Sequence, residues 1–177
     1  MSEQEHDRQS GSADPRFVCD CMCCGASKCL RAWGYYAHWE YGITDEQVVG
    51  MAVRDDLIVV TCDSGIMARN VITSGRAKAI FIPVGLDRWA QFAAVLKEVP
   101  LPRCDPRCMS CGEELERIDK EQFREELPLR TYEWLDEFWR CKACEQFFWK
   151  GTHWQDIAGK LDEVEQEYEK GSGSRGL

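Results

Sequence analysis

The sequence predicts an α/β fold, in which a parallel β-sheet is flanked by helices and followed by a small cysteine-rich domain. Three observations lead to this prediction. Apolar runs of strand length alternate with amphipathic segments of helical periodicity up to residue 100. Two of the runs, at 57–61 and 79–82, are almost wholly apolar, which is typical of strands buried on both faces of a parallel sheet. After Pro100 the composition changes, and five of the 11 cysteines fall in residues 104–160.

The elements of the first half follow one another in alternating order. We expect strands at 16–20, 35–38, 57–61 and 79–82, and helices at 21–33, from 44 onward, at 64–74 and at 87–99. The helix at Thr44 opens with a capping-box signature, because Gln47 lies three residues later. Parallel strands joined in this way bring their carboxyl ends to one edge of the sheet, where a binding site is expected.

The chain divides by composition into four parts. We expect a disordered arm at 1–14, an α/β domain at 15–100, a cysteine-rich domain at 101–160, and an acidic helix with a flexible tail at 161–177. Within the third part, residues 117–127 read as helical. The polar N-terminus lacks the basic and apolar stretches of an export signal, and no apolar run approaches the roughly 20 residues that would span a membrane.

The charge distribution gives no general attraction to nucleic acid. The chain has 177 residues and a net charge of -9, but most of the excess acid lies in the two tails, and residues 15–100 are neutral overall. Any contact with a polyanion would therefore have to be local or assisted by a metal ion. Eleven cysteines without an export signal favour a reducing compartment, with the cytoplasm as the default.

Four cysteines form two C-x-x-C pairs, Cys108 with Cys111 and Cys141 with Cys144. Each pair can form a turn that directs two thiolates toward one ion, and four sulfur ligands fit tetrahedral zinc. Such an ion would contribute about 10–16 kcal/mol of apparent binding free energy to a domain that has little core. Because four thiolates leave no open position for water, the zinc site is expected to be structural. Redox chemistry is the alternative, and Cys104 could substitute as a ligand.

Acidic residues from three chain segments are expected at the sheet edge. Asp20 ends the first strand, Asp63 follows the strand at 57–61, and Asp45 with Glu46 starts the helix between them. Clustered carboxylates repel one another and usually bind a hard divalent cation, here magnesium or manganese, which could activate water for attack on a phosphodiester. Asp is also common at strand ends and in first helical turns, so helix capping is the alternative.

An aromatic and basic stretch lies near the end of the cysteine-rich domain. Residues 147–149 are all aromatic, Lys150 follows, and His153 lies in an expected turn at 151–154. This combination could stack on or hydrogen-bond an RNA base. A histidine that satisfies backbone groups in a tight turn is the alternative.

Several motifs in this chain resemble one protein family. In order they are Arg-Phe-Val-Cys-Asp at 16–20, Cys-Leu-Arg-Ala-Trp-Gly-Tyr at 29–35, Thr-Asp-Glu at 44–46, Val-Val-Thr-Cys-Asp at 59–63, Glu-Phe-Trp-Arg-Cys at 137–141 and Gly-Thr-His at 151–153. They resemble the RNase domain found at the C-terminus of mut-seven-type exonucleases and as free-standing bacterial and archaeal proteins. The resemblance covers residues 15–160 and implies a PIN-like nuclease fold with a zinc ribbon. Together with the acids it predicts a metal-dependent endoribonuclease with RNA as its partner, in which Asp20, Asp45 and Asp63 are catalytic.

The chain departs from the family pattern in the first helix. The family usually has a Leu-Gly-basic-Leu-Ala run where this chain has residues 23–27, so the basic residue expected near a phosphate is replaced by Gly25. Lys28 and Arg31 remain on this helix as candidates for RNA contact. A solvated helix face is the alternative role for both side chains.

A second departure follows the third strand. Many PIN-like sites have a further acid just after the position of Asp63, where this chain has Ser64 and Gly65. Glu46 and Asp87 are candidates for an additional ligand, although Asp87 also suits a helix start. The alternative function is therefore a non-catalytic RNA- or protein-binding module whose acidic site has decayed.

Six further cysteines lie near the acids, five of them between Cys19 and Cys29 and one at Cys62. Small apolar residues are needed where a helix packs on a sheet, and free cysteine fills such positions well. A second metal site built from thiolates and reversible thiol oxidation are the alternatives.

Overall fold

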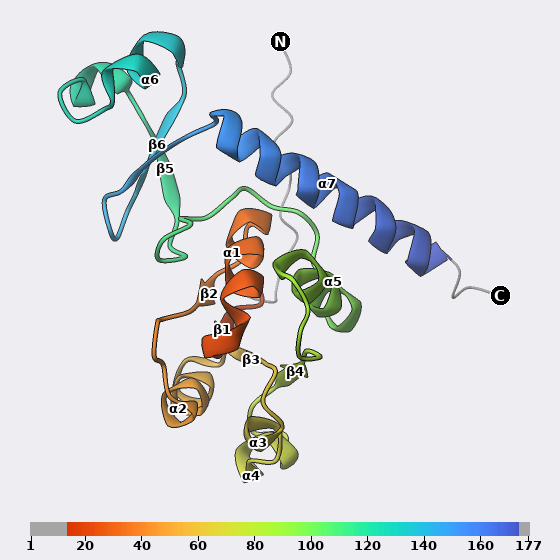
Figure 1. Ribbon diagram of the computed structural model, residues 1–177. Helices are drawn as coiled ribbons and strands as arrows, with labels where there is room; N and C mark the ends of the chain where they lie inside the picture. The colour runs from red at the N-terminus through yellow and green to blue at the C-terminus, as the bar shows by residue number, and fades with distance from the viewer. Residues whose placement is uncertain (1–13, 174–177) are drawn as a thin grey trace.

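The computed structural model describes residues 14–173 of the chain (Figure 1). Apart from Asp14, the predicted N-terminal arm lies outside the described residues, as do residues 174–177 of the predicted tail. The described chain forms a parallel α/β unit, a smaller antiparallel unit, and a long final helix. No described helix is long and apolar enough to cross a membrane.

The first unit contains the predicted parallel sheet. Its four strands are β1 (Phe17–Cys19), β2 (Ala37–His38), β3 (Ile58–Thr61) and β4 (Ala79–Phe81), in the order β2-β1-β3-β4. All three neighbouring pairs are parallel. The helical segments between and after them are η1 (Cys21–Cys23), α1 (Cys24–Trp33), α2 (Asp45–Asp55), α3 (Ser64–Met67), α4 (Asn70–Thr73) and α5 (Arg88–Glu98). The predicted order of strands and helices is confirmed.

The sheet is covered on both faces because its strands alternate between two clusters of apolar side chains. Phe17 and Cys19 pack in the larger cluster with α1 and α5, whereas Val18, between them in sequence, packs in the smaller cluster with α2. All three side chains are fully buried. Burial on both faces explains why the strands read as continuous apolar runs.

The helix predicted at 64–74 is divided into two short helices. Ala68 caps the first, and Arg69 is extended, with φ -62° and ψ 136°, before the second begins. This break lets the guanidinium of Arg69 donate to Glu46 over 2.9 Å. A long-range ion pair thus accompanies the interruption, and local periodicity does not reveal it.

The second unit is a three-stranded antiparallel sheet formed by β5 (Leu115–Ile118), β6 (Phe138–Cys141) and β7 (Phe147–Trp149). Two short segments, η2 (Lys120–Phe123) and α6 (Leu129–Trp134), lie between β5 and β6. The expected helix at 117–127 is therefore wrong, because only the short 3-10 segment η2 falls within this range and residues 124–126 form a turn. Arg117 and Ile118 pair with β6 instead, because strand pairing satisfies their backbone groups along the neighbouring chain.

The final helix, α7 (Thr152–Gly173), begins where a turn was expected and nine residues before the predicted acidic helix. It runs from the antiparallel unit back over α1 and α5 (Figure 1). Its side chains Leu161 and Val164 are buried in the larger apolar cluster. The boundary predicted at 160/161 thus falls inside one continuous helix, and the division into independent domains stays a prediction.

The connection between the two units is held against the end of α1. The indole N–H of Trp33 donates to the carbonyl of Leu101 over 2.8 Å, and the amide of Cys104 donates to the carbonyl of Trp33 over 3.0 Å. Gly34, at φ +106°, ends α1, and a Cβ placed there would lie 2.5 Å from the Cβ of Cys104. Glycine at this position permits both the left-handed cap and the close approach of the connection.

Candidate functional site

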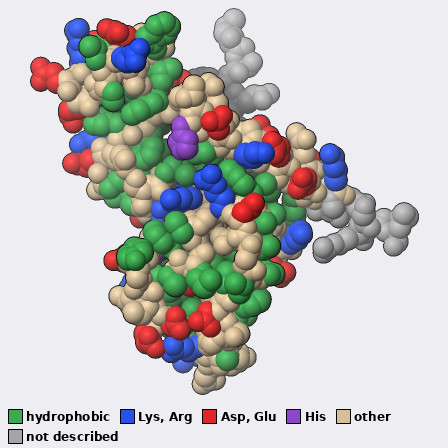
Figure 2. Space-filling view, in the orientation of Figure 1, with side chains coloured by type: hydrophobic (Ala, Val, Ile, Leu, Met, Phe, Trp, Pro, Cys, Tyr) green, Lys and Arg blue, Asp and Glu red, His purple; other side chains and the backbone are tan. Residues whose placement is uncertain are grey.

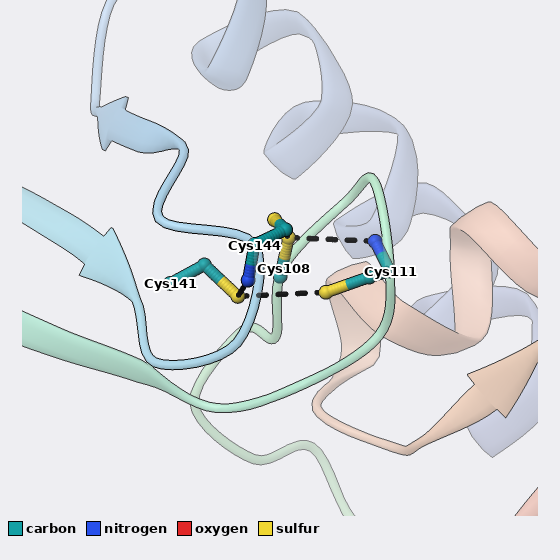
Figure 3. Close-up of side chains that lie close together, drawn as sticks. All are labelled: Cys108, Cys111, Cys141 and Cys144. Atoms are coloured by element: carbon teal, nitrogen blue, oxygen red, sulfur yellow. Dashed lines mark hydrogen bonds between the residues drawn. The ribbon is translucent and has the colours of Figure 1, made fainter.

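The four predicted metal ligands converge in the antiparallel unit (Figure 3). Cys108 and Cys111 come from the loop before β5, Cys141 ends β6, and Cys144 lies in the turn between β6 and β7. Their four sulfur atoms lie within 4.8 Å of one another, with 3.5 Å between Cys108 and Cys144 and 3.4 Å between Cys111 and Cys141. Tetrahedral zinc with Zn–S bonds of about 2.3 Å requires sulfurs about 3.8 Å apart, so the arrangement fits this ion after a small expansion.

Backbone amides favour thiolates at this centre. The amides of Ala143 and Cys144 donate to the sulfur of Cys141 over 3.4 and 3.5 Å, and the amide of Cys111 donates to the sulfur of Cys108 over 3.4 Å. Burial by itself raises the pKa of Cys141, but these amides and the neighbouring thiols lower it to about 7. Burial raises the pKa of Cys111 to about 12, so only part of the site is ready to ionise before a cation arrives.

Cys104 lies outside this centre. Its thiol lies 3.9 Å from the hydroxyl of Tyr35 and 3.6 Å from the carbonyl of Pro102. The alternative in which Cys104 replaces one of the four ligands is therefore wrong for this arrangement. The four-cysteine set has no free ligand position, which suits a structural role.

Asp20 lies at the carboxyl end of β1, as predicted, and its side chain is only 4% exposed. One carboxylate oxygen accepts a 2.8 Å hydrogen bond from the amide of Met22. The other accepts the hydroxyl of Thr61 and, over 2.9 Å, the amide of Cys62, both at the end of β3. Donors from two neighbouring strand ends therefore fix the orientation of this carboxylate.

Asp63 lies at the same edge of the sheet, two residues after the end of β3. Its amide donates to the hydroxyl oxygen of Thr61 over 2.9 Å, so Thr61 links it to Asp20. The Asp63 side chain is exposed, and one of its oxygens accepts a 2.6 Å hydrogen bond from the amide of Gly65. Asp63 thus caps α3 while its carboxylate remains accessible to solvent.

Asp45 and Glu46, at the start of α2, lie beside the guanidinium of Arg69. The separations are 3.7 Å for Asp45 and 2.9 Å for Glu46, and the contact with Arg69 lowers the pKa of Glu46. Within residues 14–170, the four cysteines form the only group of three or more potential ligands that is close enough to hold one ion. Asp20, Asp45 and Asp63 are therefore not brought together as a three-carboxylate cluster.

Asp87 caps α5 and accepts hydrogen bonds from the amides of Trp89 and Ala90 over 3.0 and 2.9 Å.

Arg88, the first residue of α5, explains why the chain has glycine at position 25. A Cβ at Gly25 would lie 2.5 Å from the Cβ of Arg88, so α1 and α5 approach too closely for any larger residue. Arg88, which the sequence did not single out, therefore occupies the space that a side chain at position 25 would need.

A groove with a volume of about 810 Å³ separates the parallel unit from the antiparallel unit. Lys28 of α1 and His153 of α7, two predicted RNA-contact residues, both line it, together with Arg88 and Trp89 of α5. Figure 2 shows basic and hydrophobic side chains gathered near a histidine where the two parts of the molecule meet. The groove also contains Trp39 and Trp89, which sequence analysis missed because their segments are far from residues 147–154 along the chain.

Arg31 also borders the groove, but its side chain is 2% exposed and both alternatives proposed for it are wrong. Its Nε donates to the carbonyl of Ala37 over 2.8 Å. Its Nη1 donates to the carbonyls of Met109 and Ser110 over 2.9 and 3.0 Å, inside the loop between the first two cysteine ligands. Arg31 therefore positions the loop between Cys108 and Cys111 against α1. Its side chain is not solvated, and its guanidinium is not free to contact RNA.

Lys150, the remaining RNA-contact candidate, lines a smaller adjoining cavity of about 220 Å³. Its ammonium lies 5.0 Å from the centre of the Trp139 ring. The two cavities share Phe148, Trp149 and Trp154, so Lys150 lies beside the same aromatic surface.

Four of the six cysteines near the acids fill the helix–sheet junction, namely Cys19, Cys23, Cys29 and Cys62, whereas Cys21 is exposed and Cys24 is only partly buried. Cys19, Cys23 and Cys29 are buried in the larger cluster, and burial raises the pKa of all three thiols, to about 12 for Cys29. The sulfurs of Cys23 and Cys62 lie 3.6 Å apart, but no second group of metal ligands forms among the described residues.

Fold and site together define a class of protein. The protein has an α/β fold with a parallel four-stranded sheet flanked by helices, and the four-cysteine cluster in its appended antiparallel unit is consistent with a zinc ribbon. The family model of the Mut7-C RNAse domain matches residues 15–161, and the chain belongs to this family. No curated protein and no solved structure gave a significant match.

Proposed function

We propose that this protein is a metal-dependent endoribonuclease that hydrolyses RNA at the carboxyl edge of the parallel sheet. Membership of an RNase-domain family supports a nuclease. The observation that carries the proposal is the environment of Asp20, which is buried, fixed by three donors, and linked through Thr61 to the exposed Asp63. Preorganised carboxylates from adjacent strand ends are suited to holding a cation against a substrate phosphate.

The residues at this edge are chemically suited to magnesium or manganese. Magnesium is usually bound through one or two carboxylates, with water and substrate phosphate completing its shell, so a three-carboxylate cluster is not required. Asp20 and Asp63 would supply these carboxylates. When bound, the ion would activate water and neutralise charge developing on the phosphodiester.

The remaining acids have supporting roles in this proposal. Arg69 holds Asp45 and Glu46 at the start of α2, where both also favour the helix N-terminus. Thr61 fixes the carboxylate of Asp20 and accepts from the amide of Asp63, and so sets the relation between the two proposed ligands.

A non-catalytic RNA- or protein-binding module is the second candidate, and one observation favours it. Asp20 and Asp63 both cap the helical segments that follow them, η1 and α3. Capping alone would stabilise the fold whether or not a metal binds. Activity measurements must therefore be separated from effects on stability.

The experiment measures cleavage of a mixed RNA pool with manganese, with chelator, and by Asp20→Asn and Asp63→Asn proteins. We expect both substitutions to lower the rate by at least about 100-fold, since each removes a proposed metal ligand. Asp63→Asn is the decisive variant because its side chain is exposed. Asp20→Asn also directs an amide toward buried donors and should lower the free energy of unfolding by about 1–3 kcal/mol.

The matched control is Asp119→Asn. Asp119 is an exposed cap on η2 that accepts from the amide of Glu121 over 3.1 Å, so it has the local role of Asp63 in a different part of the fold. Its substitution should leave cleavage within about twofold of the parent. If the parent does not cleave RNA with manganese, or Asp63→Asn cleaves as well as the parent, the binding-module function replaces the nuclease.

A further inference from the structure

We propose that the groove between the two units binds single-stranded polynucleotide by stacking unpaired bases on its tryptophans and pairing phosphates with Lys28 and Arg88. This inference rests on the proposed function for the identity of the strand as RNA. Single-stranded DNA has the same chemistry as single-stranded RNA in this respect, since both carry phosphates and exposed base faces. The site therefore makes the protein selective for unpaired segments.

The first observation is the absence of acid from the groove. None of the described residues that line it is Asp or Glu, although the chain as a whole has 31 acidic residues and a net charge of -9. Lys28 and Arg88 are both exposed, and within the described chain neither forms an ion pair with a carboxylate. Other arginines are neutralised, as Arg103 is by Asp162 and Glu165. The groove is therefore a local cationic site on an acidic protein.

The second observation is the aromatic lining. Four of the seven tryptophans in the chain line the groove, namely Trp39, Trp89, Trp149 and Trp154, and each is only partly buried. The Arg88 guanidinium lies 5.1 Å from the centre of the Trp89 ring, which places a phosphate-binding charge beside a stacking surface. Partly exposed aromatic rings interleaved with cations are typical of surfaces that bind single strands, since every base has a face that can stack.

The third observation is that one end of the groove lies near Asp20. Trp39 lines it and donates from its indole N–H to the carbonyl of Cys21 over 3.4 Å. Cys21 follows Asp20 directly, so one end of the groove lies next to the acidic edge of the sheet. A strand lying in the groove would therefore continue toward the proposed cleavage site.

An unpaired strand fits this surface better than a duplex does. Bases in a duplex are stacked on one another and cannot offer their faces to side chains, so an aromatic groove discriminates against paired RNA. A protein partner would instead require complementary acidic and apolar side chains, and binding of such a partner is an outcome that the test distinguishes.

The test measures binding of a fluorescent single-stranded RNA to the full chain without added divalent cation, as a function of salt. Lys28→Met and Arg88→Met should each lower the salt dependence of log K by about 0.7, the value for one phosphate contact on a single strand. Trp89→Leu should weaken binding by about 10-fold or more with an unchanged salt slope, because stacking releases no counterions. Thermal melting of each variant shows that the fold is retained.

Two further arms identify the ligand. Single-stranded DNA should compete, whereas duplex RNA and inorganic polyphosphate should compete poorly, because neither offers free base faces. Lys97→Met is the matched control, since Lys97 is exposed on the last turn of the same helix as Arg88 and lies outside the groove. Its substitution should change neither affinity nor slope.

The inference is wrong if the parent does not bind single-stranded RNA, if the groove variants bind it as the parent does, or if polyphosphate competes as well as RNA. These outcomes are separate from those of the cleavage assay. Cleavage by the parent with unaffected binding in the groove variants would overturn only this inference. If binding depends on the groove but the parent does not cleave RNA, only the proposed nuclease function is wrong.

Discussion

The guanidinium of Arg31 is buried and donates hydrogen bonds to three backbone carbonyls from two parts of the chain. One carbonyl belongs to Ala37 in β2, and the other two belong to Met109 and Ser110 in the loop between Cys108 and Cys111. A planar side chain with several fixed donors can bridge groups in this way, whereas a lysine ammonium cannot reproduce the same geometry. At the scale of a single residue, Arg31 thus connects the helix after Asp20 to the metal centre.

Replacing Arg31 with alanine should destabilise the protein by about 3 kcal/mol or more, because three buried carbonyls would lose their donor. Arg31→Lys should recover only part of this loss. Urea unfolding followed by tryptophan fluorescence measures the change in the free energy of unfolding.

The control for Arg31 is Lys28→Ala, one turn earlier on α1 and exposed. Its free energy of unfolding should lie within about 0.5 kcal/mol of the parent. Equal stability of Arg31→Ala and Lys28→Ala would show that the three hydrogen bonds do not contribute.

Among the elements, the antiparallel unit has the smallest apolar core. Phe138 and Leu127 are buried there, but no side chain of β5 or β7 is buried. A metal ion held by Cys108, Cys111, Cys141 and Cys144 would therefore supply cohesion that packing does not. Because the loop of Cys108 also receives Arg31, the same metal should order the edge of the groove.

Freshly purified, reduced protein should contain one zinc per chain. Cys141→Ser should lower the zinc content well below one, since it removes the ligand that accepts two backbone amides. Elemental analysis measures the metal, and hydrogen exchange should show loss of protection first in β5, β6 and β7.

Cys104→Ser is the control for the zinc ligands, because Cys104 lies in the same connection but outside the centre. It should retain one zinc per chain. Zinc-free parent protein, or zinc loss from Cys104→Ser equal to that from Cys141→Ser, would contradict the assignment of the four ligands.

At the scale of the whole molecule, α7 makes the two units share a core. The helix follows β7 in the chain, and its residues Leu161 and Val164 pack in the apolar cluster formed by α1, α5 and the sheet. Arg103, in the connection, pairs with Asp162 and Glu165 on the same helix and lies 5.1 Å from the ring centre of Trp33. The acidic end of the chain is therefore part of the packing around α1.

Leu161→Ala should lower the free energy of unfolding by about 2–5 kcal/mol, because it leaves a cavity where the side chain is fully buried. Hydrogen exchange should show the loss of protection in α1 and α5 as well as in α7. Glu163→Ala, on the exposed face of α7 where Glu163 pairs with Lys160, should change stability by less than about 0.5 kcal/mol. If exchange in α1 and α5 is unaffected by Leu161→Ala, α7 does not stabilise the parallel unit.

Local patterns made much of this fold predictable. Apolar runs indicate the parallel strands, the Thr44 and Gln47 pair marks the capping box that opens α2, and the four converging cysteines come from two short C-x-x-C segments. These features depend on neighbours within a few residues, where periodicity and side-chain reach are fixed by covalent geometry. The break at Arg69 was not predictable in this way, because its acidic partners lie on another helix.

The sequence by itself determined the class of fold, the four cysteines that converge and the acids that follow β1 and β3. Only the tertiary structure decided that Arg31 is buried and donates a hydrogen bond to Met109, which is 78 residues away in sequence. It also decided that Gly25 leaves room for Arg88, and that separate segments form one groove whose described lining contains no acidic residue. The physical reason is that these contacts depend on which surfaces pack together to bury apolar area. That choice is made by the whole chain, and no local spacing encodes it.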